Sequence, residues 1–351
     1  MGLEGISGDR GSGVNVLSDG FLVTFQALMT LLLISAFGWI GVRQKLVSDQ
    51  GVEGMTRVLV DVVVPAKMMI IVAGYLNAET LKICAQLISV MYGVSFLGYG
   101  FAWLVVKIWR GTGITRETNN AIMALCMMQN SFFLALPLAM AICPPEHLSL
   151  MALLTTSAYV VLLSLQWTVG VILLSSVEAA KPTFFQQIKP LFNLPLAGIL
   201  LGAVFSQIPI FAAAARGEEA PLLVLIPMNA ARTLGDALSP VAMLTLGMMI
   251  AQCELGKALR VRTVLITIAF RFFVSPVVIL GLIHLFGWAT TAPVLALALM
   301  IQAAMPPATA SPIVARRYGG DWQSMSATLL VMYSGALLAV PFWLSFLKVN
   351  F

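Results

Sequence analysis

Two short segments of the chain interrupt long apolar stretches with polar residues and proline. Residues 130–137 read NSFFLALP, and residues 305–312 read MPPATASP. A proline removes one backbone donor and its ring clashes with the preceding turn, so we expect a helix through each segment to split near Pro137 and Pro312. Backbone freed in this way needs hydrogen-bond partners or lines a wet cavity. The polar side chains available at the two breaks are those of Asn130, Ser131, Thr309 and Ser311.

The chemistry that these segments could perform is the binding of a small anion. The second half of each broken helix starts with free N–H groups that together carry about half a positive charge, and such an end binds anions. Two of these ends, converging from opposite sides, would suit a carboxylate. The substrate-binding residues that we predict are Asn130, Ser131, Pro137, Met305, Thr309, Ser311 and Pro312.

The composition places both segments in a membrane. Hydrophobic residues make up 60% of the chain and charged residues 10%, with a mean hydropathy of +0.95, which exceeds what a soluble core requires. Apolar stretches of about 20 residues recur, each long enough to cross roughly 30 Å of hydrocarbon, and we expect helices because an unpaired strand edge cannot face lipid. The prediction is an all-α polytopic membrane protein of about ten transmembrane helices, at 20–42, 55–75, 81–106, 118–142, 148–176, 190–208, 222–252, 262–287, 290–315 and 325–347.

An internal duplication accounts for the pairing of the two segments. Residues 61–68 (DVVVPAKM) match residues 236–243 (DALSPVAM) at the same offset of 175 that separates Pro137 from Pro312. Five helices per half is an odd number, so the second half must be inverted, and broken helices four and nine can then cross near the bilayer midplane. Interrupted helices in equivalent positions of two halves indicate the binding site of a secondary transporter.

This 5+5 inverted repeat sets the predicted boundaries. Residues 1–19 are rich in Gly and Ser and are expected to be disordered and extracytoplasmic, followed by a retained first helix. The first repeat is expected over 20–176, a short cytoplasmic linker over 177–189 and the second repeat over 190–351.

The distribution of basic residues predicts the orientation. Five connections on one side of the predicted helices hold 13 of the 20 Lys and Arg residues, and the other side holds four. The 13 are Arg43, Lys45, Arg57, Lys107, Arg110, Arg116, Lys181, Lys189, Lys257, Arg260, Arg262, Arg316 and Arg317. The positive-inside rule then places these connections in the cytoplasm and both termini outside the plasma membrane. The basic connections on the cytoplasmic side of the lipid bilayer thereby account for the net charge of +5, and no nucleic-acid partner is expected.

Placing a charged residue at the centre of the bilayer costs about 2.5–3.5 kcal/mol on insertion scales, so charged residues inside the predicted spans need a role or a partner. Arg232 and Asp236 are four residues apart, which favours a local ion pair. Asp61 and Asp236 are equivalent in the repeat, which suggests matched structural roles. Lys67 could balance a carboxylate substrate, although structural pairing is favoured. Arg271 could do the same, although we expect its side chain to reach the cytoplasmic interface.

Several other functions are disfavoured. A metalloprotease needs His-Glu-x-x-His, whereas His147 and His284 are isolated in the sequence. An aspartyl protease needs two facing Asp residues, and Asp61 with Asp236 is the only pair available. We therefore expect no enzyme, no metal and no cofactor, and four cysteines without CxxC spacing agree with this. Sodium/proton antiporters carry an acidic residue beside such a crossing, and neither 126–137 nor 302–315 contains one. A channel and a non-transporting sensor stay open. A sodium symporter of the bile-acid type also stays open, because carbonyls and hydroxyls alone can bind Na⁺.

An ordered set of segments resembles the auxin efflux carrier family. The segment NSFFLALPL (130–138) resembles the family's Asn-x-x-Phe-x-x-x-Pro-Leu pattern, and AAMPPATASPIVARRYGGD (303–321) its Met-Pro-rich crossover. Further agreement comes from VDVVVPAKMM (60–69), LFNLPLAGILLG (191–202), LGDALSPVAMLTLGMMI (234–250) and SATLLVMYSGALLAVPFW (326–343). The resemblance covers the chain beyond residue 20. The Pro306-Pro307 doublet departs from the family's single proline.

The resemblance implies an efflux-type secondary carrier of a small organic anion, such as a carboxylate or an auxin-like acid. It implies that helices one, two, six and seven form a scaffold, through which two copies would dimerise. The two crossing bundles would move against this scaffold as an elevator. By position, Asn130 matches the family's substrate-facing asparagine, and Pro137 and Pro312 match its crossing prolines. The short 177–189 linker is typical of prokaryotic members. Coupling to H⁺ or Na⁺ stays open.

Overall fold

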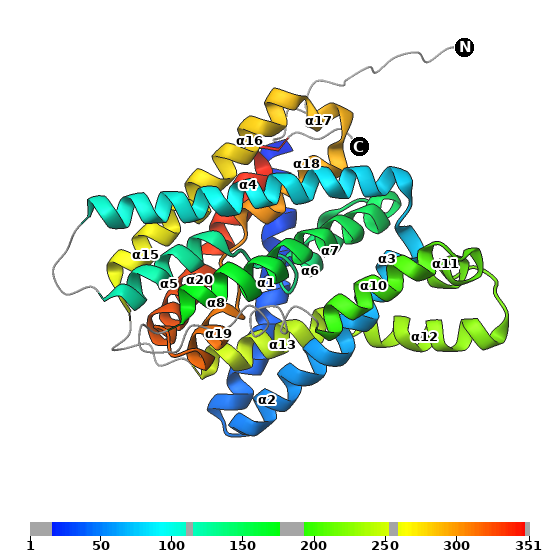
Figure 1. Cartoon of the computed structure of the whole chain (residues 1–351), viewed down its shortest axis with the longest axis horizontal. Helices are drawn as coiled ribbons and strands as arrows, with labels where there is room; N and C mark the ends of the chain where they lie inside the picture. The colour runs from blue at the N-terminus through cyan, green and yellow to red at the C-terminus, as the bar shows by residue number, and fades with distance from the viewer. Residues whose placement is uncertain (1–15, 110–114, 176–192, 253–258, 348–351) are drawn as a thin grey trace, which may run out of the picture.

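The chain folds into an assembly of helices of very different lengths (Figure 1). The computed structural model describes residues 16–109, 115–175, 193–252 and 259–347. Within these ranges the regular structure is entirely helical apart from two isolated β-bridges, and seven helices are long and apolar enough to cross a membrane. The protein is therefore a multi-span helical membrane protein, as its composition predicts.

The seven long helices coincide with seven of the predicted spans. Several are composite, because a π-helical turn or a kink joins two shorter helices on one axis. They are α1 (Val16–Arg43); α2 (Asp49–Val58), η1 (Leu59–Val63) and α3 (Val64–Tyr75); α4 (Ala78–Ile108); η2 (Pro145–His147), α7 (Leu148–Leu165), η3 (Gln166–Gly170) and α8 (Val171–Leu174); α12 (Leu222–Asp236) and α13 (Leu238–Ala251); α15 (Val261–Ile268), η5 (Ala269–Val274) and α16 (Ser275–Phe286); and α20 (Trp322–Ser345).

The other three predicted spans contain shorter helices. They hold α5 (Arg116–Met127) and α6 (Ala135–Ile142), α10 (Leu194–Ser206), and α18 (Pro293–Ala304) and α19 (Ser311–Arg317), with α17 (Trp288–Thr291) just before α18. Helix α11 (Pro209–Arg216) follows α10 beyond the end of the predicted span 190–208. A helix of 12 residues, such as α5 or α18, is about 18 Å long and covers only part of a bilayer. The count of seven is lower than ten because these regions are broken.

Helix α10 lies within the span predicted over 190–208, and α11 turns sharply away from its end. The two helices are bent by 116°. Pro209 starts α11 and restricts the preceding residue to an extended conformation, and Ile208 has φ −109° and ψ 107°. A proline at the first helical position ends one helix and starts the next, which explains the sharp turn.

Prolines also explain two of the π-helical turns. η1 and η5 each end just before a proline near the start of the following helix, at Pro65 and Pro276. A proline cannot donate to the preceding turn, and an extra residue in that turn relieves the clash of its ring. The turn at η5 includes Arg271, which the structure buries completely.

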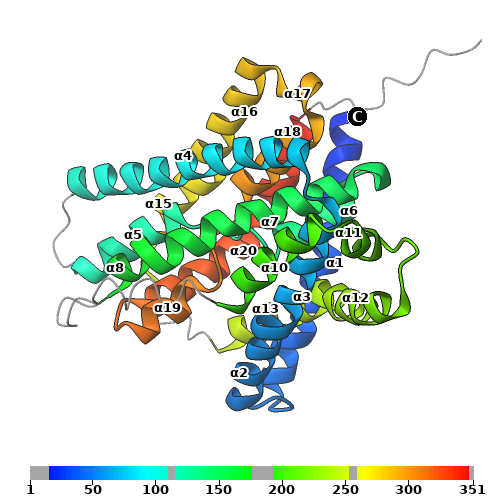
Figure 2. The same ribbon diagram turned by 45° about the vertical axis from the view of Figure 1, so that its right-hand side comes forward.

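Several helix pairs pack backbone against backbone, among them α1 with α13 and α3 with α10. A Cβ atom at Gly247 of α13 would lie 1.7 Å from the carbonyl oxygen of Ser35 on α1, and one at Gly38 would lie 2.0 Å from that of Leu244. Helix α10 approaches α3 similarly, since a Cβ at Gly198 would lie 2.5 Å from the Pro65 carbonyl oxygen. Small residues that permit such close contact are characteristic of helix association in membranes. Figure 2 shows α3, α10 and α13 lying together on one side of the bundle that contains α4, α5 and α7.

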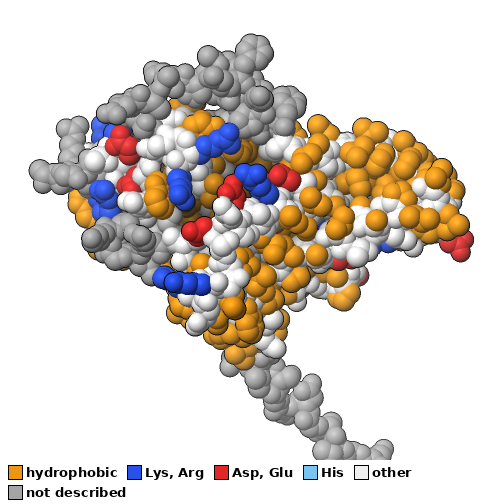
Figure 3. Space-filling model, turned by 90° about the horizontal axis from the view of Figure 1, so that it is seen from below, with side chains coloured by type: hydrophobic (Ala, Val, Ile, Leu, Met, Phe, Trp, Pro, Cys, Tyr) orange, Lys and Arg blue, Asp and Glu red, His pale blue; other side chains and the backbone are white. Residues whose placement is uncertain are grey.

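The surface separates charge from apolar area. Seen from below, Lys, Arg, Asp and Glu side chains gather on one part of the molecule, and hydrophobic side chains cover the extension formed by α10, α11 and α12 (Figure 3). Leu222, Leu223 and Ile226 of α12 are 64–88% exposed. This apolar exposure suits lipid or a protein partner in the membrane.

Three predicted segments can be compared only in part. Residues 1–15 of the expected disordered segment and the whole linker 177–189 lie outside the described residues. Helix α1 begins at Val16, so the expectation of disorder for 16–19 is wrong. The helix begins at an apolar pair, Val16 and Leu17.

Candidate functional site: two broken helices that pair with each other

The breaks expected near Pro137 and Pro312 are present. Helix α5 ends at Met127 and α6 begins at Ala135, while α18 ends at Ala304 and α19 begins at Ser311. Each proline lies in the first turn of the second half-helix, where a missing backbone donor is not needed. The prolines therefore start the second half-helices, and the extended segments 128–130 and 305–308 precede them.

These two segments run antiparallel and bond to each other. The Asn130 N–H donates to the Pro306 carbonyl over 2.8 Å, and the Ala308 N–H donates to the Met128 carbonyl over 3.0 Å. Gln129 and Pro307 face each other between these two bonds. Pro307 thus occupies a position of the pairing that requires no N–H, which explains how the chain accommodates the Pro306-Pro307 doublet.

Asn130 organises the start of α6, the second half-helix of the first break. Its side-chain oxygen accepts from the N–H groups of Phe133 and Leu134, at 3.0 and 3.5 Å, as an N-cap does. Its amide nitrogen donates to the hydroxyl of Tyr333 on α20, and that hydroxyl donates in turn to the Pro307 carbonyl at 3.4 Å. Asn130 is 1% exposed and Tyr333 2%. Tyr333 thereby joins both breaks, although no motif or spacing in the sequence singled it out.

Further polar side chains bond the two paired breaks, residues 128–134 and 305–310, which together form the crossing. The Gln302 amide donates to the Ser131 carbonyl at 3.1 Å, again linking the two breaks. Arg271 donates from Nε to the Leu125 carbonyl and from Nη2 to the Gln129 side-chain oxygen, both at 3.3 Å. Arg271 is 0% exposed, so the expectation that it reaches the membrane interface is wrong. The π-helical turn η5 directs it towards the end of α5.

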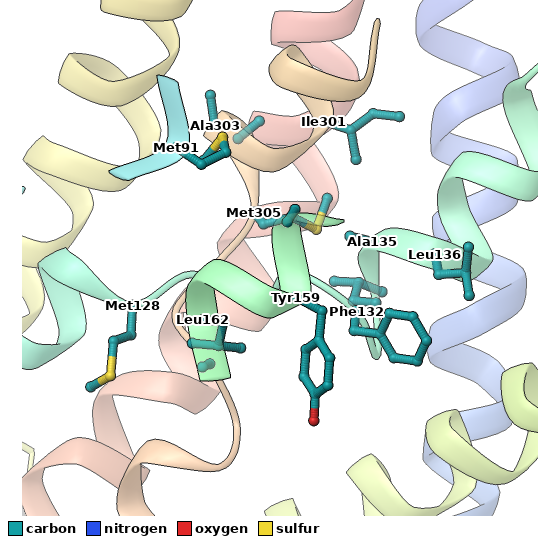
Figure 4. Packing of buried hydrophobic residues seen from close by; sticks show 14 of the residues in the cluster. Met91, Met128, Phe132, Ala135, Leu136, Tyr159, Leu162, Ile301, Ala303 and Met305 are labelled. Carbon is teal, nitrogen blue, oxygen red and sulfur yellow. The ribbon is translucent and has the colours of Figure 1, made fainter. Parts of the chain in front are cut away.

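An apolar shell surrounds these polar groups. Figure 4 shows Met305 close to Ala135, and Phe132 beside Tyr159 of α7. The Phe132 and Tyr159 rings have centroids 4.9 Å apart. A dry surrounding strengthens each hydrogen bond of the crossing, and it makes an unsatisfied polar group costly.

A small cavity borders the crossing. Its volume is about 50 Å³, which is space for only one or two water molecules. The side chains on its two sides therefore leave little free space between them. Phe133, Thr309, Ala310 and Ile313 line it from the crossing. Thr56, Leu59, Val60, Ala242, Thr245, Leu246 and Met249 line it from α2, η1 and α13.

The predicted binding residues fall into two groups. Asn130, Ser131, Met305 and Thr309 lie in the two breaks, and Pro137, Ser311 and Pro312 lie in the first turns of α6 and α19. Lys67 lies elsewhere, on α3, where its Nζ atom is 2.8 Å from the Asp236 carboxylate of α12. Structural pairing, the favoured alternative for Lys67, is what the structure shows.

The expected local pair between Arg232 and Asp236 is wrong. Arg232 donates from Nη2 to the carbonyls of Ala214 and Ala215, at 2.7 and 2.8 Å, and so caps the C-terminal end of α11. A cation at that end is favoured by the helix dipole. Asp236, the last residue of α12, bonds Lys67 instead.

Asp61 does not share the role of Asp236. It is exposed on η1, and it forms none of the ion pairs found among the described residues. The expectation of matched structural roles for these two residues is therefore wrong. Within the same ranges, no group of three His, Cys, Asp or Glu side chains is placed to hold a metal ion.

Connections that the charge pattern places on the same side of the membrane contact each other in the structure. Thr118, near the start of α5, and Arg260, just before α15, both contact Asp321, which precedes α20. Thr118 Oγ1 lies 2.7 Å and Arg260 Nε 3.7 Å from the Asp321 carboxylate. Gln252 donates to Asp49 over 2.8 Å. All five residues lie in or beside connections predicted for one side.

An all-helical membrane protein with two broken helices that pair at their breaks has the architecture of a secondary transporter. The family model described as "Membrane transport protein" matches residues 23–344, and the chain belongs to this family, the auxin efflux carrier family of transporters. Two relatives from Arabidopsis thaliana are similar to part of it. Protein PIN-LIKES 7 is 29% identical over 166 residues, which cover 46% of this chain and 42% of the relative. Protein PIN-LIKES 5 is 25% identical over 152 residues, which cover 42% and 38%.

Proposed function

We propose that the protein is a secondary active carrier that moves a small organic anion, such as a carboxylate or an auxin-like acid, across the plasma membrane by alternating access. The observation that carries this proposal is the antiparallel pairing of the two breaks, in which Asn130 bonds Pro306 and Ala308 bonds Met128. Unwound backbone inside a membrane protein is tolerated where it is buried or lines a cavity, and transporters place their substrates there.

The topology proposed is a 5+5 inverted repeat of ten helices. It is supported by breaks at equivalent positions, since α6 and α19 start at Ala135 and Ser311, 176 residues apart, close to the sequence offset. The bent pair α10–α11 and the two broken helices would add three spans to the seven long helices. The positive-inside rule would then place both termini outside the cell.

An anionic substrate is supported by the electrostatics of the breaks. The first turns of α6 and α19 bring N–H groups towards the crossing, and neither break contains Asp or Glu. Asn130 would orient the substrate through its second amide hydrogen, with Ser131, Thr309 and Ser311 adding hydrogen bonds. The Ser311 hydroxyl is buried and has no partner among the described residues.

An elevator movement is supported by where the small cavity lies. One of its walls is the crossing, and the other is formed by α2, η1 and α13, which belong to the proposed scaffold. At about 50 Å³ the cavity is too small for an organic acid, so the two walls must separate before a substrate can enter. The exposed apolar face of α12 is available for the homodimer through the scaffold that we propose.

A sodium-coupled symporter of the bile-acid type is a second candidate. The Gln302 side-chain oxygen is buried near the end of α18 and has no donor among the described residues. An oxygen acceptor of this kind, beside the free carbonyls of a helix end, is the ligand type that Na⁺ requires.

Counterflow uptake into proteoliposomes tests these functions together. We expect saturable exchange of at least one of labelled lactate, succinate or indole-3-acetate. Parallel assays with Na⁺ or H⁺ gradients distinguish a sodium symporter from an uncoupled or proton-coupled carrier. Absence of exchange by folded protein with every anion would refute the carrier and favour a membrane sensor.

A further inference from the structure

Arg271 presents a positive charge that no acidic side chain of the surrounding helices can neutralise. It is fully buried on η5, and it takes part in none of the ion pairs found in the described ranges. Between residues 78 and 177 the only acidic residues are Glu79, Glu117 and Glu146, and between 255 and 351 the only one is Asp321. These lie at helix ends or in connections, and Asp321 is engaged by Thr118 and Arg260. A buried charge without a partner costs several kcal/mol.

The partners that Arg271 does have satisfy it only in part. Its Nε atom bonds the Leu125 carbonyl at the end of α5, and its Nη2 atom bonds the Gln129 side-chain oxygen. Its Nη1 atom is buried and has no acceptor among the described residues. The ring of Phe270 lies 5.6 Å from the guanidinium carbon and offers only a weak additional attraction.

Gln129 adds a second donor in the same position. Arginine has no acceptor, so the Gln129 amide must turn its oxygen towards Arg271 and its nitrogen away. That nitrogen is buried and also has no acceptor within the described ranges. Two adjacent side chains, both about 99–100% buried, therefore carry unused donors at one point of the crossing. Unused donors beside an uncompensated positive charge call for an anionic acceptor.

The position of Gln129 connects this charge to the substrate site. Gln129 faces Pro307 in the paired breaks and precedes Asn130, whose side chain caps the start of α6. We propose that Arg271 and Gln129 form the charge-neutralising part of the anion site, and that the carboxylate of the substrate accepts from Arg271 Nη1 and Gln129 Nε2 when the crossing opens. This assignment rests on the proposed transport of an organic anion and names the residues that balance its charge. Neutralisation by a fixed guanidinium lowers the cost of carrying a carboxylate through hydrocarbon.

The variant Gln129→Glu separates an anion site from a purely structural contact. A carboxylate at this position would bond Arg271 more strongly than the amide does and would mimic a bound anion. We expect the purified Gln129→Glu protein to unfold at a higher temperature than the wild type and to lose the stabilisation that added lactate, succinate or indole-3-acetate gives the wild type. Its counterflow uptake should fall at least about tenfold, the scale of losing a buried charge partner. If Arg271 serves only to hold the end of α5, the same variant would keep wild-type uptake and KM, and the proposal would be overturned.

Three further variants complete the experiment. Asn120→Glu places the same charge on α5, about 10 Å along the helix before its last residue, Met127, and should leave uptake and anion stabilisation unchanged. Arg271→Lys keeps the charge and should raise KM with uptake still measurable, whereas Arg271→Gln should abolish both uptake and anion stabilisation. The stabilisation assay also separates the two proposals. Wild-type protein that is stabilised by an anion but exchanges none refutes the carrier alone, while wild-type protein that no anion stabilises refutes the Arg271–Gln129 site.

Discussion

At the scale of single residues, Asn130 has two tasks that its amide can perform together. The oxygen caps the first turn leading into α6, and the nitrogen contacts Tyr333, which also bonds the opposite break through Pro307. Asn is among the preferred N-cap residues because its short amide can accept from the N–H groups of the next turn. The residue predicted to meet the substrate thus also maintains the shape of the site, and its loss should affect both.

Asn130→Ala should abolish anion uptake and lower the stability of the protein by roughly 1–2 kcal/mol, because a cap and a buried hydrogen bond are lost. Counterflow and thermal unfolding in detergent measure the two effects. Tyr333→Phe is the matched control, since it removes the hydroxyl alone and keeps the cap. Wild-type uptake by Asn130→Ala would show that the site lies elsewhere.

Lys67→Met should keep anion uptake, because Lys67 pairs with Asp236 away from the two breaks. The pair is partly exposed, with side chains 20% and 60% accessible, so its removal should cost about 1 kcal/mol or less. The charge exchange Lys67→Asp with Asp236→Lys should recover the stability that either single change loses. Loss of uptake in Lys67→Met with an unchanged unfolding temperature would show that Lys67 acts in substrate binding.

At the scale of helices, prolines and glycines decide the geometry in different ways. Prolines 137 and 312 start new half-helices, and Pro209 produces the turn between α10 and α11. Glycines 38 and 247 instead allow α1 and α13 to touch along their backbones, which no larger residue would permit. The first effect follows from local backbone chemistry, while the second depends on a neighbour more than 200 residues away.

Gly247→Val should separate α1 from α13 and destabilise the protein by at least about 1–3 kcal/mol, the scale of overpacking a closely packed contact. Thermal unfolding of the purified protein measures this effect. Gly281→Ala on α16 is the control, because a Cβ there meets no atom within 4 Å, and it should leave stability unchanged or slightly raised. Equal stability of Gly247→Val and wild type would contradict the close contact.

At the scale of the whole molecule, function is proposed to depend on movement between two parts. The crossing and α13 both line the small cavity, and a substrate can enter only if they separate. Helices α1 and α13, and α3 and α10, are in such close contact that they are expected to move together. A larger space of about 170 Å³ lies between α1, α13 and α20, with Tyr333 on its wall, so α20 also borders the proposed scaffold.

A short cleavable cross-link between Ala242→Cys and Ala310→Cys should block counterflow, because these residues line opposite walls of the cavity. Cleaving it should restore uptake. The background needs the four native cysteines replaced. Lys67→Cys with Asp236→Cys is the control, since both residues belong to the proposed scaffold and their cross-link should not interfere. Transport by the fully cross-linked Ala242–Ala310 protein would contradict the elevator.

The sequence by itself determined most of the helical segments, that the protein lies in a membrane, and that two helices break near Pro137 and Pro312. These properties follow from composition, from the length of apolar stretches and from proline chemistry, all of which act over a few residues. The tertiary structure alone decided which charges meet. Arg232 was expected to pair with Asp236, four residues away, but it caps α11, and Lys67 bonds Asp236 from another helix. Tyr333 and Arg271 join the site only because α20 and η5 pack against the crossing, and such long-range contacts leave no periodic signal in the chain.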